Sequence, residues 1–131
     1  MNDWFRKPSI QITPSIRPGR TSKLNPDVFP VTFMLDGKYR LTSLKVVSVD
    51  DIKTNKHPRV IWHMISDTAS QPTKIIIYGA PIKGMKPSVP RARPDPLQAN
   101  IPYRMFLEAS DEYQGQVDFK TVEAVAPSAQ N

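Results

Sequence analysis

The residues best suited to catalysis in this chain are a histidine, a serine and an aspartate near its middle. His63, Ser66 and Asp67 lie within five residues of one another and have the side-chain types of a nucleophilic triad. The segment around them is predicted to be a strand, so His63 and Ser66 would point to opposite faces. The chain also lacks the Gly-x-Ser-x-Gly turn that presents a nucleophilic serine. A small hydrolase is therefore only the third hypothesis for function.

A glycine-rich segment, KIIIYGAPIKGMKPS at residues 74–88, has some features of a phosphate-binding loop. Gly79 and Gly84 are separated by four residues, as such a loop requires. However, Met85 stands where the lysine is needed, and Pro87 disfavours the helix that must follow. Nucleotide binding is therefore not predicted for this segment.

Metal binding requires several ligands that converge on one point, and the sequence offers few. His57, His63, Asp50 and Asp51 would meet only through an accident of the fold. The chain has no cysteine, which excludes disulfides and thiolate ligands. We therefore predict no cofactor, no metal and no catalytic residue, and we interpret the protein as a non-enzyme.

The net charge of +6 is spread unevenly along the 131 residues. Residues 1–24 carry five basic groups and one acid, and residues 74–104 carry six basic groups and one acid, whereas residues 105–131 carry one basic group and five acids. Clustered positive charge attracts acidic proteins, anionic membranes or nucleic acid. The predicted interaction surface consists of Lys83, Lys86, Arg91, Arg93, Arg17 and Arg20. Nucleic acid is the weaker of these hypotheses, because no aromatic residue stands between Tyr78 and Tyr103.

Fourteen prolines disfavour long helices and favour short strands joined by irregular loops. Alternating or apolar runs predict strands on both sides of Asp36-Gly37, which has the composition of a hairpin turn, and residues 50–58 read as a polar loop. Further strands are predicted within residues 59–66, 73–79, 103–110 and 115–122. The consecutive isoleucines of the run at 73–79 indicate a strand that is covered on both faces. The sequence thus predicts an all-β, antiparallel two-layer β-sandwich of about seven short strands.

Three regions are predicted along the chain. Residues 1–30 form an irregular, basic, proline-containing arm, which we interpret either as an edge strand or as the stub that follows a membrane anchor. Residues 31–122 form the sandwich domain, and residues 123–131 form a flexible tail. An upstream anchor would make the protein periplasmic or envelope-associated, and without one we expect it in the cytoplasm.

The segment from Leu97 to Ala109 resembles one corner of fibronectin type III domains. Leu97 is followed after five residues by Tyr103, and apolar residues then alternate along the next strand. In that family the tyrosine hydroxyl bonds to the backbone near the corner and ties one sheet to the other. Asn100 tolerates the positive φ of the connecting turn. Trp62, on the third predicted strand, is instead similar to the immunoglobulin arrangement, whose paired cysteines are absent here.

A fold of this family does not fix a function, and no chemical motif remains to supply one. The first hypothesis is therefore a structural or protein-interaction module, in the setting of a membrane-anchored or envelope-associated protein. It would bind a partner protein through edge strands and the proline-rich loop, and edge strands would also allow a homo-oligomer. The alternative is a small basic nucleic-acid-binding domain.

Overall fold

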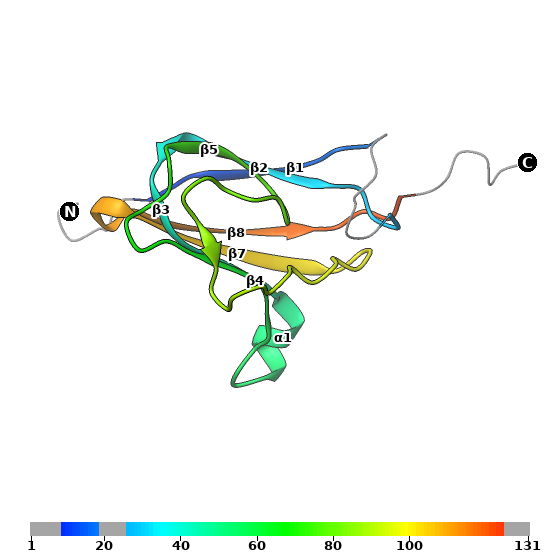
Figure 1. Ribbon diagram of the computed structural model, residues 1–131. Coiled ribbons are helices and arrows are strands. Elements are labelled where there is room, and N and C mark those ends of the chain that lie inside the picture. The colour runs from blue at the N-terminus through cyan, green and yellow to red at the C-terminus, as the bar shows by residue number, and fades with distance from the viewer. Residues whose placement is uncertain (1–8, 19–25, 125–131) are drawn as a thin grey trace, which may run out of the picture.

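Short strands separated by prolines and turns pack into two antiparallel sheets, as predicted (Figure 1). The computed structural model describes residues 9–18 and 26–124. One sheet has the strand order β1-β2-β5 and the other the order β6-β4-β3-β7-β8. The strands of the described residues therefore number eight rather than about seven. The elements are β1 (Ile12–Ile16), β2 (Val31–Tyr39), β3 (Leu41–Ser48), α1 (Val49–Thr54), β4 (Val60–Ile65), β5 (Thr73–Ile77), β6 (Lys86–Pro87), β7 (Pro102–Ala109), the 3₁₀ turn η2 (Ser110–Glu112) and β8 (Gln114–Lys120).

The hairpin predicted at Asp36-Gly37 is wrong. β2 continues through both residues to Tyr39, and the chain then crosses at Arg40 into the other sheet, so β2 and β3 do not pair. Gly37 does not have the positive φ that a two-residue hairpin turn requires. The Asp36 carboxylate instead accepts hydrogen bonds from the Tyr39 hydroxyl (2.7 Å) and the Gln11 N–H (3.3 Å). Asp36 thus ties β2 to β1.

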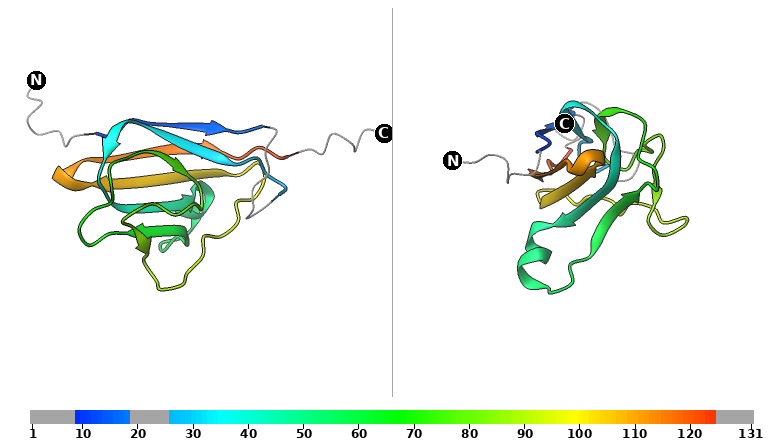
Figure 2. Two further views of the ribbon diagram at one scale, coloured as in Figure 1. Left: turned by 45° about the horizontal axis from the view of Figure 1, so that its top comes forward. Right: turned by 90° about the vertical axis from the view of Figure 1, so that its left-hand side faces the viewer.

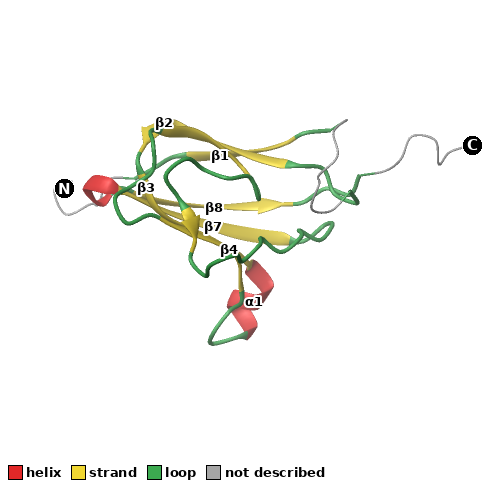
Figure 3. Ribbon diagram, in the orientation of Figure 1, coloured by secondary structure: helices red, strands yellow, loops and turns green. Residues whose placement is uncertain are grey.

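The first part of the predicted polar loop 50–58 is a short helix, α1, drawn in red in Figure 3. Ser48 caps its start, because its hydroxyl accepts a hydrogen bond from the Asp51 N–H (3.4 Å). Asp50 and Asp51 stand in the first turn, where the positive end of the helix dipole favours acids. The Ser48 cap and the two first-turn acids explain why a helix forms in a segment whose polar composition predicts a loop.

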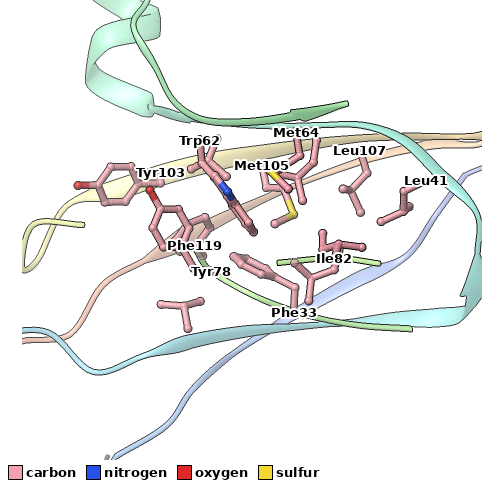
Figure 4. Packing of buried hydrophobic residues seen from close by; sticks show 14 of the residues in the cluster. Phe33, Leu41, Trp62, Met64, Tyr78, Ile82, Tyr103, Met105, Leu107 and Phe119 are labelled. Atoms are coloured by element: carbon pink, nitrogen blue, oxygen red, sulfur yellow. The ribbon is translucent and has the colours of Figure 1, made fainter. Parts of the chain in front are cut away.

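The core lies between the two sheets and is built from residues that alternate along the strands (Figure 4). Trp62 is 4% exposed, as its predicted place in the core requires, and its ring meets the Tyr78 ring edge-on at 4.9 Å between centroids. Phe33 and Phe119 make a similar contact from opposite sheets. Such pairs contribute roughly 0.5–1.5 kcal/mol beyond their burial.

The hydrogen bond predicted for the Tyr103 hydroxyl is present at the start of β7. Tyr103 is 4% exposed, and its hydroxyl oxygen accepts a hydrogen bond from the Gln98 N–H at 2.9 Å. Leu97 is buried beside it, and Asn100 has φ of 60°, the left-handed conformation expected of this residue. The Tyr103 hydroxyl therefore holds the loop that leads into β7 against the core.

The N-terminal region contributes to the sandwich itself. Of the two interpretations of residues 1–30, residues 12–16 form the edge strand, β1, and Ile10 and Val28 are buried in the core. The packed structure thus begins upstream of the boundary predicted at residue 31. The Ile10 N–H donates to the Gln114 carbonyl at 2.9 Å, so β1 also lies along β8 and closes one side of the sandwich (Figure 2).

Candidate interaction surface

The residues with catalytic side chains are held in structural roles or lie apart. His63 lies on the outer face of β4, opposite Lys45 on β3. Burial and, to a lesser extent, the Lys45 charge lower the pKa of His63, so the imidazole is neutral at neutral pH. The Ser66 hydroxyl accepts a hydrogen bond from the Ala69 N–H at 3.0 Å and so stabilises a turn.

Two further kinds of site are absent from the described part of the chain. Among residues 9–18 and 26–124, no three histidine, aspartate or glutamate side chains come together in a group that could hold a metal ion. No helix within these residues is both long and apolar enough to cross a membrane.

The residues of the predicted basic surface lie in different local surroundings. Lys86 makes an ion pair with Asp67 (3.2 Å), while Lys83 and Arg93 are exposed on the walls of two different grooves. Arg91 is exposed in the proline-rich loop, with φ of 66°. Arg17 follows β1 and its Nε donates to the Thr32 hydroxyl (3.4 Å). The sixth predicted residue, Arg20, lies outside the described residues.

An apolar cluster on the outer face of the β1-β2-β5 sheet was missed by the sequence analysis. Met34 on β2 is 46% exposed, and Ile75 and Ile77 on β5 are 52% and 49% exposed. Met34 lies directly opposite Ile75, so the three side chains are neighbours on one face. Arg17 adjoins them through Thr32, which lies opposite Ile77. We call Met34, Ile75 and Ile77 the apolar cluster.

The prediction that the isoleucine run is covered on both faces is therefore wrong. Only Ile76 points into the core, where it is 1% exposed. The signal that identifies the error is Lys74, because a strand buried on both faces leaves no place for its charge. A short run of apolar residues beside a lysine also fits an edge strand with one exposed face.

The backbone of β5 adds a second feature beside the apolar cluster. The Tyr78 N–H donates to the Val31 carbonyl at 3.0 Å. This bond shows which residues of β5 direct their backbone groups toward β2. Because these residues alternate in an antiparallel pair, Ile76 faces β2 and the backbone groups of Ile75 and Ile77 face away from it. The Ile77 carbonyl accepts from the Ala80 N–H (3.0 Å). Within the described residues, the Ile75 N–H and C=O and the Ile77 N–H have no partner.

A groove of about 310 Å³ runs along this free edge of β5. Its far wall is the segment 80–83, which returns along the open side between the two sheets and holds Ile82 in the core (Figures 1 and 2). The segment 80–83 is held in place by a hydrogen bond from the Gln71 N–H to the Lys83 carbonyl (3.0 Å). Lys74 and Lys83 are both exposed at the groove, and none of the described residues that line it is acidic.

The other three edges are protected in recognisable ways. β1 carries Pro14 in its middle and is tied to β8 through Ile10 and Gln114. The exposed residues of β8 are polar or charged, and one of them, Asp118, makes an ion pair with Arg104. β6 is two residues long and includes Pro87. Of the described edges, only β5 combines unpaired backbone groups with large exposed apolar side chains.

Comparison of the chain with protein-family models, with curated proteins and with solved structures finds no match in any of the three.

Proposed function

We propose that this chain is a structural or protein-interaction module that binds a partner protein through the outer face and free edge of the β1-β2-β5 sheet. The observation that carries the proposal is the half-exposure of Ile75 and Ile77 on a strand whose outward N–H groups at these two residues have no partner among the described residues. Apolar surface left in water favours association by about 25 cal/mol per Å² buried, and an open edge offers hydrogen bonds to a further strand.

The proposal extends to the fold family. In immunoglobulin-like sandwiches the first, second and fifth strands share one sheet, and the third strand lies in the other sheet together with the last two. The orders β1-β2-β5 and β3-β7-β8 correspond to this arrangement, with β4 beside β3 as the additional strand. The hydrogen bond between Tyr103 and Gln98 stands at the corner where fibronectin type III domains place theirs. Both observations support a fibronectin type III-like module.

The proposed setting is a membrane-anchored or envelope-associated protein. Trp4 and Phe5 directly precede Arg6 and Lys7, an order typical of the interface that follows a membrane span. The codons upstream of residue 1 test this part of the proposal, because an apolar segment of about 20 residues is expected there. A coding region without such a segment would refute it.

Site-directed photo-crosslinking in the native organism tests the proposed binding surface. A photoreactive amino acid in place of Ile77 should capture a distinct partner protein, whereas the same residue in place of Lys120, on the opposite edge of the molecule, should not. The capture should disappear in an Ile75→Thr variant, because threonine keeps the strand propensity but removes apolar surface. Equal capture at Ile77 and Lys120 would contradict the proposal.

Nucleic-acid binding is the second candidate, and one observation favours it. Phe106 lies opposite Lys45 on the outer face of the larger sheet, where an aromatic ring and a cation stand together. Such pairs bind single-stranded nucleic acid by stacking and charge. A titration with a random oligonucleotide at low ionic strength tests this candidate, since real binding would weaken steeply as salt is added.

A further inference from the structure

We propose that the groove beside β5 binds an extended peptide strand in which apolar residues alternate with acidic residues. This inference rests on the proposed function and specifies the chemistry of the partner. The first support is the backbone: the Ile75 N–H and C=O and the Ile77 N–H face the groove without partners in the described residues. A strand added to β5 would satisfy these groups, as in other cases of strand addition to a sheet edge.

The two sides of the groove differ, and this difference predicts the alternation of the bound strand. Ile75 and Ile77 project from the outer face of the sheet, next to Met34. Lys74 belongs to the other side of β5, the side on which the return segment with Lys83 runs. Successive side chains of an added strand would thus meet apolar groups and lysines in turn. β5 has five residues, so about five residues of the partner can pair.

The charge of the groove selects an acidic strand over a second copy of this chain. Pairing β5 with another β5 would bring Lys74 and Lys83 of both copies to one groove without any acid among the described lining residues. Like charges repel in such a junction, whereas glutamate or aspartate in the partner strand would pair with each lysine. The exposed area is also small: three half-exposed side chains fall well below the roughly 800 Å² per subunit of a stable dimer.

Binding of designed peptides to the full chain tests the inference. The probe is a labelled peptide of six residues that alternates glutamate and valine, compared with a peptide that alternates lysine and valine. We expect the acidic peptide to bind at least about tenfold more tightly, with an affinity that falls as salt is added. An acidic peptide N-methylated at alternate residues should lose most of its affinity, because it cannot complete the hydrogen bonds of the edge.

Amide hydrogen exchange locates the binding without any substitution. In the free protein the amides of Ile75 and Ile77 should exchange quickly, while that of Ile76, which faces β2, should be protected. The acidic peptide should slow exchange at Ile75 and Ile77 and leave Ile76 unchanged. Protection elsewhere in the chain would overturn the inference.

A pair of charge reversals provides the matched control. Lys74→Glu with Lys83→Glu should weaken binding of the acidic peptide roughly tenfold or more and favour the basic peptide. Lys56→Glu with Lys120→Glu changes the net charge equally at exposed positions outside the groove and should change binding little. Equal effects of the two pairs, or equal binding of both peptides, would overturn the inference.

The outcomes also separate this inference from the proposed function. If neither peptide binds while crosslinking at Ile77 still captures a partner, the partner chemistry is wrong and the interaction surface stands. If sedimentation instead reports a dimer that is lost on Ile75→Pro, the occupant is a second copy of this chain. Loss of crosslinking at Ile77 refutes both proposals.

Discussion

Replacing Tyr103 by phenylalanine removes the one oxygen atom that ties the loop before β7 to the core. The hydroxyl accepts the Gln98 N–H at 2.9 Å, and the ring is 4% exposed, so the variant keeps the packing and leaves one donor unpaired. A fully buried unpaired donor costs about 1–3 kcal/mol. Because Gln98 itself is exposed, water satisfies its N–H in part, and we expect the free energy of unfolding to fall by about 1–2 kcal/mol.

Urea unfolding followed by tryptophan fluorescence measures this loss. For a slope of about 1–3 kcal/mol per molar urea, the midpoint should fall by roughly 0.5–1 M with the slope unchanged. Tyr113→Phe is the matched control, because its hydroxyl makes no hydrogen bond within the described residues and its ring contacts Tyr39. If both variants lose the same stability, or neither loses any, the hydroxyl does not fix the corner.

Three further effects on stability are expected. Trp62→Ala should cost about 3–5 kcal/mol in urea unfolding, because it empties the centre of the core; a loss below 1 kcal/mol would contradict its burial. Gly115→Ala should cost about 1–3 kcal/mol, since the added carbon meets the Ile10 carbonyl, whereas Gly37→Ala finds only ordinary contacts and should cost less. Burial raises the pKa of Tyr78, so the phenol loses its proton at a lower pH in the unfolded chain than in the folded one. The free energy of unfolding should therefore fall as the pH rises above about 10, and urea unfolding should show a smaller fall in Tyr78→Phe.

The sequence predicts the sandwich well because its two strongest signals are local. Prolines and short alternating runs indicate strands and turns without reference to the rest of the chain. The spacing of Leu97 and Tyr103 likewise predicts a hydrogen bond between residues that are close in the sequence. The buried positions of Trp62 and Met105 follow from alternation alone. These features need no knowledge of which strands pair.

The wrong turn at Asp36-Gly37 has the opposite cause. A turn dipeptide between two β-prone runs has two outcomes, and only the pairing partners of β2 decide between them. β2 pairs with β1 and β5, so Asp36 bonds across to Gln11 and the chain stays extended until Arg40. No local signal specifies that the next strand belongs to the other sheet.

Local sequence patterns also could not predict the candidate interaction surface. Positive charge was the visible signal, but ion pairs such as that of Lys86 with Asp67 form between segments 19 residues apart and remove part of it. The apolar cluster depends on Met34 lying opposite Ile75, a contact between strands about 40 residues apart in the chain. Among those predicted basic residues that the structure describes, Lys83 alone lines the β5 groove.

The lysines at this groove bear on whether its open, apolar edge would pair with a second copy of the chain. Sheet edges are commonly protected by proline, shortness or charge, and β5 has only the last two. Lys74 and Lys83 do not cover the free backbone groups, so they leave the edge open to an acidic strand while repelling a second β5. In the proposed complex, the same two charges would act against self-association and would select an acidic partner. Reversing both charges separates the two effects. The Lys74→Glu with Lys83→Glu variant should no longer bind the acidic peptide. It should not dimerise either, because the two glutamates of each copy would repel those of the other, as the lysines do.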